Sequence, residues 1–201
     1  MSDSARAACD GWNSSACVGT EHCPPRCPRF VDKHGSRWTL RPTREGDAER
    51  LAEMYEAFGI QDRAQGVPPT VDQRRRSWVD TLLSEGENVV AADRDRLVGH
   101  VVYTPSDGDR PELAVFVHPS FQERGIGTEL CKHAIAAAAD ADREALELHV
   151  ESSNRAALSV YRRLGFTVVD RDGDVRMTLP LDEAIATTAR MPPAERMPTP
   201  K

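Results

Sequence analysis

Residues 115–139 constrain the fold most. They combine a strand that contains β-branched valines, a short turn, and an alanine-rich helix that begins at Gly125 and Gly127. The start of a helix presents unpaired backbone N–H groups and the positive end of the helix dipole, which together suit a phosphate group. The two glycines lack the Cβ atoms that would hinder close approach of an anion to the backbone. Gln122 and Arg124 add side-chain donors beside the turn. The segment therefore predicts a pyrophosphate-binding turn between a strand end and a helix start.

Two better-known phosphate-binding loops do not match this segment. A P-loop requires Gly-Lys-Ser/Thr, and no lysine follows Gly127. A dinucleotide-binding fingerprint requires a third glycine, and Leu130 occupies that position. Taken alone, the glycine pair leaves two interpretations open, a phosphate site and an ordinary strand-to-helix turn.

A second motif lies in residues 150–166, where a strand end leads into a predicted helix. Asn154 and Tyr161 are seven residues apart, which is two helical turns, so both side chains project from the same side of that helix. Gly165 suits the end of the helix, because a glycine adopts the left-handed conformation without strain. The second motif therefore places an amide and a phenol on one helix face.

Hydrophobic periodicity and turn residues predict a strand, two helices, three strands, a helix, a strand, a helix and two strands. We expect strands at 38–41, 88–92, 97–103, 112–117, 145–150, 166–169 and 175–179, and helices at 43–58, 71–83, 125–139 and 154–164. The chain thus divides into a cysteine-bearing segment at 1–36, one α/β domain at 37–181, and a proline-rich tail at 182–201 that we expect to be disordered.

Both motifs resemble those of a known family. Gln122-Glu-Arg-Gly125-Ile-Gly127 resembles the Gln/Arg-x-x-Gly-x-Gly/Ala motif of the Gcn5-related N-acetyltransferases (GNAT), and the run from Asn154 to Phe166 resembles the next motif of that family. The order of predicted elements is also similar, so the resemblance covers residues 37–181. It implies the acyl-CoA N-acyltransferase fold, in which a central mixed, mostly antiparallel sheet is flanked by helices.

The resemblance also implies an enzyme that transfers an acetyl group from acetyl-CoA to a primary amine by direct attack in a ternary complex. The implied ligands of the CoA pyrophosphate, acting mostly through backbone N–H groups, are Gln122, Arg124, Gly125, Ile126, Gly127 and Thr128. Val115 and Val117 would present free backbone groups to the pantetheine arm, or would serve as plain strand core. Asn154 would bond the pantetheine amide, although a helix N-cap is its alternative role.

Tyr161 is implied as the general acid that protonates the leaving thiolate, and its alternative is a buried tyrosine on a helix face. Direct attack on a thioester needs positioning, an oxyanion donor and a base for the amine proton. The backbone N–H near Val117 is the expected oxyanion donor. Glu112 is the first candidate for the base, ahead of a set that otherwise suits a solvated surface: Glu151, His149 and His118. Cys131 is expected to pack inside its helix, and no Cys–His pair indicates a covalent acetyl-enzyme.

The N-terminal segment contains most of the cysteines, and large apolar side chains are scarce there. Thiolates can order such a segment around a tetrahedral zinc ion. The candidate ligands are Cys9, Cys17, Cys23 and Cys27, with His22 or His34 as possible replacements for one cysteine. Their spacing lacks the usual C-x2-C pair, so a disordered leader with incidental cysteines stays open as the alternative.

Charge and hydropathy limit the partners. No run of eighteen apolar residues occurs and the first residues have no apolar signal-peptide core, so we expect a cytoplasmic protein without a membrane partner. The net charge of −6 argues against non-specific nucleic-acid binding. A monomer or a homodimer is expected.

Two further functions compete with catalysis. A CoA-binding regulatory or scaffold protein could use a zinc-bearing leader to dock a partner, and a zinc module could recognise nucleic acid through Arg26, Arg29, Lys33 and Arg37. The acceptor amine is not specified by sequence. Residues 61–70 and Arg74–Arg76 are expected to face it, which leaves protein N-termini, lysine side chains, amino acids, polyamines and aminoglycosides open.

Overall fold

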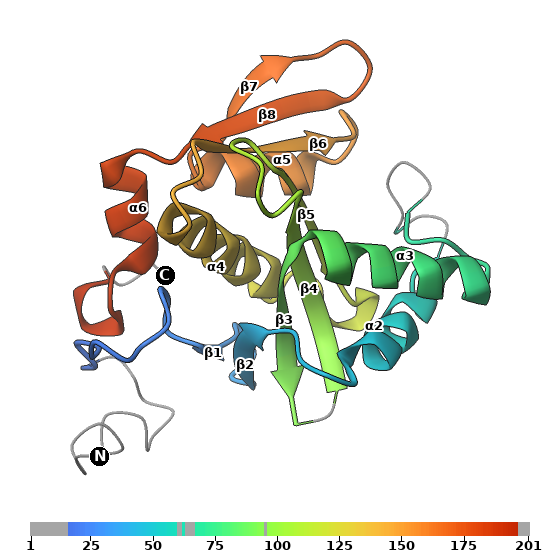
Figure 1. The fold of residues 1–201 in the computed structure, drawn as a ribbon, viewed down its shortest axis with the longest axis horizontal. Coiled ribbons are helices and arrows are strands. Elements are labelled where there is room, and N and C mark those ends of the chain that lie inside the picture. The colour runs from blue at the N-terminus through green and yellow to red at the C-terminus, as the bar shows by residue number, and fades with distance from the viewer. Residues whose placement is uncertain (1–15, 60–61, 63–66, 95, 197–201) are drawn as a thin grey trace.

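The computed structural model describes residues 16–59, 62, 67–94 and 96–196, and these form one eight-stranded sheet flanked by helices (Figure 1). The strands are β1 (Arg29–Val31), β2 (Arg37–Pro42), β3 (Glu87–Asp93), β4 (Arg96–Thr104), β5 (Glu112–Val117), β6 (Ala145–Val150), β7 (Thr167–Asp170) and β8 (Val175–Pro180). The helices are α2 (Asp47–Glu56), α3 (Asp72–Glu85), α4 (Ile126–Asp140), α5 (Arg155–Arg163) and α6 (Glu183–Arg190), with short 3-10 turns η2 (Pro119–Phe121) and η3 (Pro193–Glu195). The predicted α/β class and the predicted order of elements are confirmed.

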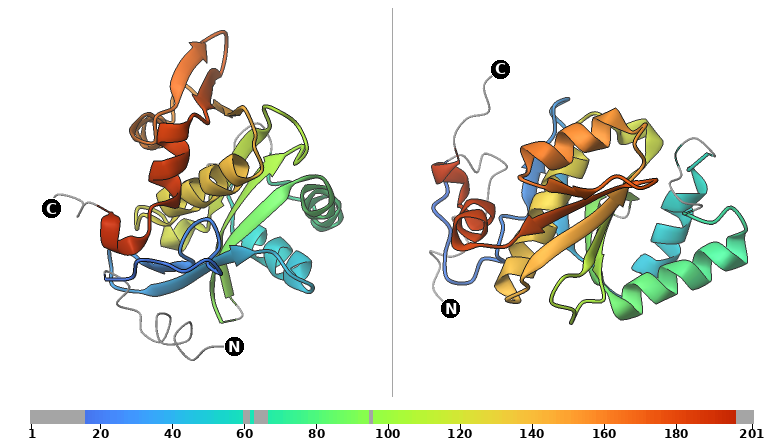
Figure 2. Two further views of the ribbon diagram at one scale, coloured as in Figure 1. Left: turned by 60° about the vertical axis from the view of Figure 1, so that its left-hand side comes forward. Right: turned by 90° about the horizontal axis from the view of Figure 1, so that it is seen from above.

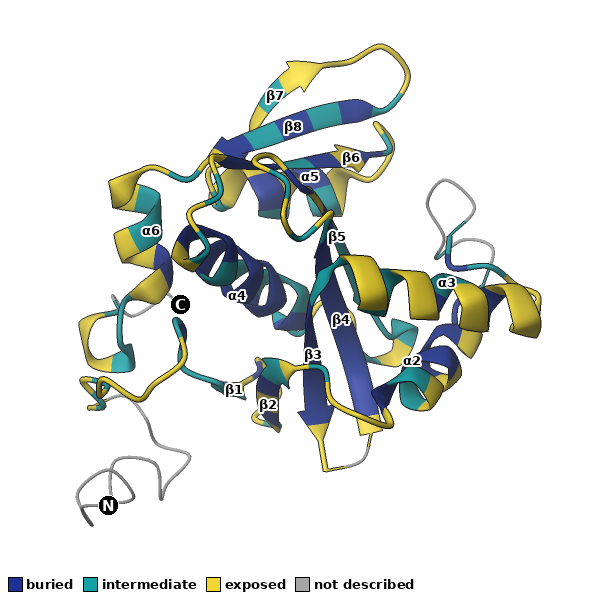
Figure 3. Ribbon diagram, viewed as in Figure 1, coloured by how far each residue is buried: buried dark blue, intermediate teal, exposed yellow. Residues whose placement is uncertain are grey.

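The sheet runs in the order β1-β2-β3-β4-β5-β6-β8-β7, and every neighbouring pair is antiparallel except β5 and β6. Helix α4 covers one face of β3 and β4, while α2 and α3 cover the other (Figures 1 and 2). Because both faces are covered, β3 and β4 are almost continuously buried (Figure 3). Two apolar cores result, one between the sheet and α4 with α5, and a smaller one beneath α2 and α3.

Strands β5 and β6 separate soon after they meet. Their only paired residues among those described are Glu112 and Glu147, whereas β4 and β5 stay paired from Glu112 to Val117. Beyond Glu112 the strands therefore leave a gap in the middle of the sheet. Helices α4 and α5 begin beside this gap, and the site is built there.

Helix α2 starts later than predicted. We expected it to begin at residue 43, but its N-cap is Gly46, in the left-handed conformation. The reason is Asp47, whose buried carboxylate accepts hydrogen bonds from the Arg44 backbone N–H and from the Arg41 guanidinium. These bonds hold residues 43–46 in a turn rather than in the helix.

The chain ends are more ordered than the sequence suggested. Helix α6 lies within the segment for which we expected disorder, and part of the leader packs beside α4 and α6 (Figures 1 and 2). Arg26 connects them, since it donates to the Glu129 carboxylate and, over 2.6 Å, to the Ala189 carbonyl. Ala194 also donates its backbone N–H to the Cys17 carbonyl. For residues 183–190 the prediction of disorder is wrong, because this helix is held by Arg26, which is distant in sequence.

In the part of the chain that the structure describes, no helix is long and apolar enough to cross a membrane.

Candidate active site

A cavity of about 660 Å³ lies where β5 and β6 separate. Its lining comes from four segments: the turn after β1, strand β5, the turn into α4, and helix α5. The chain therefore brings both sequence motifs to one site, although they are far apart in sequence. Of the predicted donor-site residues, those that line the cavity are Val115, Val117, Gln122, Gly125, Ile126, Gly127, Thr128, Asn154 and Tyr161.

Val115 and Val117 direct backbone groups into the gap. The His118 N–H donates to the Val98 carbonyl, so the hydrogen-bonded pairs between β4 and β5 fall on the even-numbered residues of β5. By alternation, the N–H and C=O groups of Val115 and Val117 point toward β6, which among the described residues pairs with β5 at Glu112 and Glu147 alone. The Val117 carbonyl accepts from the Gln122 side-chain amide at 3.2 Å, so the edge of β5 offers an extended ligand the backbone groups of Val115 and the N–H of Val117.

The turn into α4 has the geometry of an anion site. Gly125 has a φ of +91° and serves as the N-cap. Because the first helical hydrogen bond runs from Glu129 N–H to the Gly125 carbonyl, the N–H groups of Ile126, Gly127 and Thr128 precede the ladder. A Cβ at Gly127 would lie 3.3 Å from Cγ2 of Val117, and both residues line the cavity. The glycine therefore keeps the helix start open to a ligand.

Arg124 is placed differently from the prediction. Its guanidinium forms an ion pair with Asp32 at 2.6 Å, donates to Ser36, and stacks over Trp38 and Phe121. It does not belong to the cavity lining. The side chain we expected to bind a phosphate instead fastens the turn to the hairpin of β1 and β2.

Asn154 caps helix α5 and still has hydrogen-bond donors available for a ligand. Its side-chain oxygen accepts from the Ala157 N–H at 3.0 Å, which confirms the N-cap of α5. An amide that accepts with its oxygen still has two N–H donors. Since Asn154 also lines the cavity, these donors are near any ligand held there.

Tyr161 lies on the inner face of α5, 8% exposed, and lines the cavity. Burial raises the pKa of its phenol well above the usual value, and the nearby Cys131 adds to this effect. The phenol therefore stays protonated and can donate a hydrogen bond. Cys131 packs in the core as expected, and burial raises its pKa to about 12, so it remains a thiol.

The base candidates lie outside the cavity lining. Glu112 stands on the opposite face of β5 from Val115, and its Oε1 is 3.2 Å from Nδ1 of His149. Glu151 accepts from Ser153, and His118 caps η2 by accepting from the Ser120 N–H. Only Glu112 and His149 form a pair, on the side of the gap that faces away from α4.

The face beneath α2 and α3 carries an aromatic cluster. Tyr55 contacts Trp78 and Phe116 edge-on, at centroid distances of 4.9 and 5.3 Å. The Tyr55 hydroxyl is 2.6 Å from Nδ1 of the buried His100, whose Nε2 is 2.9 Å from the Asn88 side-chain oxygen. Burial lowers the pKa of His100 to about 3, so this ring is neutral and structural.

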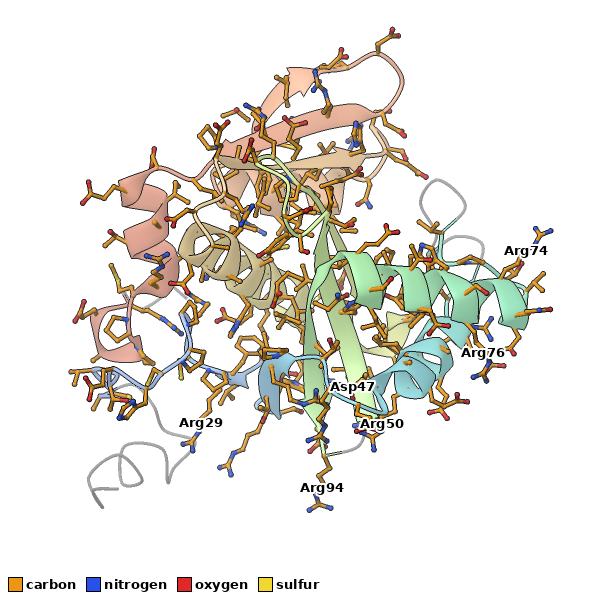
Figure 4. The ribbon with its side chains drawn as sticks, in the orientation of Figure 1. Arg29, Asp47, Arg50, Arg74, Arg76 and Arg94 are labelled. Atoms are coloured by element: carbon orange, nitrogen blue, oxygen red, sulfur yellow. The ribbon has the colours of Figure 1, made fainter. Side chains whose placement is uncertain are left out.

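The arginines at 74–76 on α3 do not form a continuous positively charged surface along which a substrate could approach. Arg75 is buried and donates to the Ala52 and Thr70 carbonyls, while Arg76 pairs with Glu49 and Asp72. Arg74 and Arg76 lie at the outer end of α3 (Figure 4). Most of the loop at 61–70 that we expected beside them lies outside the described residues.

The predicted zinc site is not supported. Cys17, Cys23 and Cys27 are free cysteines, and Cys9 lies outside the described residues. Across the described ranges, no three His, Cys, Asp or Glu residues gather as a metal would require. Instead, Cys23 contacts Thr20, and the Cys27 backbone lies beside His133.

Sequence reasoning missed several lining residues, and among them Lys33 is a cation beside the glycine turn. Lys33, in the turn after β1, lines the cavity beside Gly125. No local pattern identifies it, because its place depends on pairing of β1 with β2 and on the contact with Arg124.

A family model described as the acetyltransferase (GNAT) family matches residues 49–166. The L-amino acid N-acyltransferase MnaT of Escherichia coli strain K12 is 29% identical over 137 residues, covering 65% of this chain and 80% of that protein. A mycothiol acetyltransferase of Propionibacterium freudenreichii is 29% identical over 133 residues, covering 64% of this chain but only 43% of that protein.

Solved structures show the same fold. The GNAT domain of S. lividans PAT superposes with a TM-score of 0.67 at 21% identity, over 76% of this chain and 95% of that one. The yncA putative acetyltransferase of Salmonella typhimurium, solved with its cofactor acetyl-CoA, gives a TM-score of 0.61 at 25% identity, over 74% and 96% of the two chains.

Proposed function

The chain belongs to the acetyltransferase (GNAT) family and is an acyltransferase, and we propose that it transfers an acetyl group from acetyl-CoA to a primary amine by direct attack in a ternary complex. One observation carries this proposal: a single cavity joins the open edge of β5, the glycine turn and the inner face of α5. These three features match the three parts of the donor, namely an amide-bearing arm, a pyrophosphate and a thioester. When bound in this cavity, acetyl-CoA would supply the activated acetyl group.

In this proposal, chain residues hold each part. The N–H groups of Ile126, Gly127 and Thr128 bind the pyrophosphate, helped by the positive end of α4. Val115 and Val117 pair with the pantetheine arm as a strand would, and the Asn154 amide donates to it.

The reacting centre lies near Val117 and Tyr161. The Val117 N–H faces the gap and donates to the carbonyl oxygen as negative charge develops on it. Tyr161, kept protonated by burial, donates toward the leaving sulfur and acts as the general acid. Its raised pKa makes it a weaker acid than an exposed phenol, so the hydrogen bond to sulfur is the larger part of its role.

The acceptor approaches from the face beneath α2 and α3. Glu112, oriented by His149, takes the proton from the amine directly or through a water molecule. We propose an amino acid or similarly small amine as acceptor, because three relatives are named for L-amino acids or for methionine sulfoximine and sulfone. The aromatic cluster of Tyr55, Trp78 and Phe116 gives this face an apolar wall suited to an uncharged side chain.

Release of free thiol from acetyl-CoA over a panel of amines tests the proposal. The panel contains L-amino acids, methionine sulfone, a polyamine, an aminoglycoside and a lysine peptide. We expect turnover with at least one free amino acid. Tight CoA binding without thiol release from any member would instead support a CoA-binding scaffold.

A further inference from the structure

The hairpin of β1 and β2 begins before the region that the family model matches, yet its turn reaches the donor cavity. We propose that Lys33, at this turn, binds the pyrophosphate of CoA and supplies the positive charge that Arg124 does not. The inference rests on the proposed function in one respect, that a CoA molecule occupies this cavity.

The hairpin is fixed to the phosphate turn by three contacts. The Lys33 N–H donates to the Arg124 carbonyl at 3.1 Å. The Arg124 guanidinium pairs with Asp32 and donates to the Ser36 hydroxyl at 2.7 Å. Within the hairpin, Asp32 also accepts from the Trp38 indole N–H at 2.7 Å. Although burial alone would raise the pKa of Asp32, the hydrogen bonds from Trp38, Ser36 and His34 and the charge of Arg124 lower it. The turn is therefore held rigidly beside Gly125.

The position of the Lys33 side chain points to the anion site. A Cβ placed on Gly125 would lie 4.0 Å from Cε of Lys33, so the ammonium-bearing end of the side chain passes over the start of α4. The N–H groups at this helix start and a lysine ammonium favour the same ligand, an anion. The helix start and the Lys33 side chain both line one cavity.

The charges along the cavity agree with this assignment. The cations among the lining residues are Lys33 and Arg163, and the lining carboxylate is Glu123. Within the described ranges, no carboxylate lies within ion-pair distance of the Lys33 ammonium, whereas Arg124 is neutralised by Asp32. Lys33 is thus the cation beside the glycine turn whose charge is available to a ligand.

Calorimetric titration of the full chain with CoA, dephospho-CoA and pantetheine tests the inference. Dephospho-CoA keeps the pyrophosphate and lacks the 3′-phosphate, while pantetheine lacks both. We expect Lys33→Ala to weaken binding of CoA and of dephospho-CoA by about tenfold, as for loss of one partly exposed charge-assisted hydrogen bond. Pantetheine binding should not change. Lys33→Arg should keep most of the affinity. Lys132→Ala, which removes a half-buried lysine of α4 that does not line the cavity, should keep all of it.

A salt titration adds a readout that a folding defect would not produce. The dependence of CoA affinity on salt concentration should become shallower in Lys33→Ala, because one ionic contact is lost. Equal CoA affinity in Lys33→Ala and wild type would overturn the inference, as would an equal loss with pantetheine. If Lys33→Ala weakens the binding of CoA but not of dephospho-CoA, Lys33 contacts the 3′-phosphate. That result would overturn the assignment of Lys33 to the pyrophosphate. If wild type binds CoA but transfers no acetyl group, the proposed function fails while the role of Lys33 stands.

Discussion

The two faces of the sheet are built on different principles. On the α4 side, the donor cavity relies on backbone groups: the edge of β5, the start of α4, and glycines that leave both accessible. On the α2 and α3 side, the proposed acceptor face consists of side chains, including an aromatic cluster and the Glu112–His149 pair. A site made of backbone tolerates few sequences and is recognisable, whereas a site made of side chains is free to vary. The contrast explains why the donor is easier to infer than the acceptor.

The largest effect is expected from filling the glycine turn. Gly127→Val places a branched side chain against Val117, at a helical position where the backbone is unstrained. We expect CoA affinity and kcat/KM to fall by more than about a hundredfold, since near-contact of the phosphate with the backbone is lost. The far-UV circular dichroism spectrum should not change.

Gly46→Asn is the matched control for this variant. It changes a glycine at the start of a different helix, the N-cap of α2, which has open space around it, and asparagine tolerates the left-handed conformation. Equal CoA affinity in Gly127→Val and Gly46→Asn would show that the turn is merely structural.

Tyr161→Phe should lower kcat by about a hundredfold with little change in the KM for acetyl-CoA. The hydroxyl is expected to act on the leaving sulfur only as the bond breaks, and the ring keeps its packing against Phe166. Steady-state kinetics at saturating amine provide the measurement. Tyr103→Phe, which alters a buried tyrosine outside the cavity lining, should leave kcat unchanged. An unchanged kcat in Tyr161→Phe would remove the general acid from the mechanism.

Glu112→Gln is expected to lower kcat/KM for the amine by about tenfold without altering CoA affinity. The effect is smaller because His149, its partner, can take over part of the proton transfer. Rates measured across pH separate a base from a binding group, since added alkali should restore the variant by deprotonating free amine. Glu144→Gln, on an exposed residue before β6, is the control. A wild-type rate at every pH would exclude Glu112 as the base.

The smallest effect is expected from a change in the packing of the acceptor face. Tyr55→Phe removes the hydroxyl next to His100 and leaves a buried ring nitrogen without its partner. We expect a loss of about 1–2 kcal/mol in the free energy of unfolding, measured by urea denaturation. CoA affinity should stay the same, because the cluster lies across the sheet from the donor cavity. A parallel loss of CoA affinity would show that the two faces are coupled.

Sequence reasoning was most successful where a residue's role depends on near neighbours. The glycine turn, the Asn154 cap and the order of elements all follow from spacing within one or two turns of chain. It failed where a side chain is positioned by distant residues. The pairing of Arg124 with Asp32 and the burial of Arg75 beneath Ala52 left no local signature. Lys33 enters the cavity only because such long-range contacts place its turn there.

The Arg26–Glu129 contact has a consequence for anyone shortening this chain. Glu129 is buried, and although burial would raise its pKa, the ion pair and hydrogen bonds from Arg26 hold it below the usual value. An expression fragment cut at residues 49 and 166 would discard Arg26, Ala189 and Arg196 together. The carboxylate would then lose its closest cation and keep Lys132, at 3.9 Å, one turn from the phosphate-facing glycines. A minimal catalytic fragment must therefore keep both termini through Arg26 and Arg196.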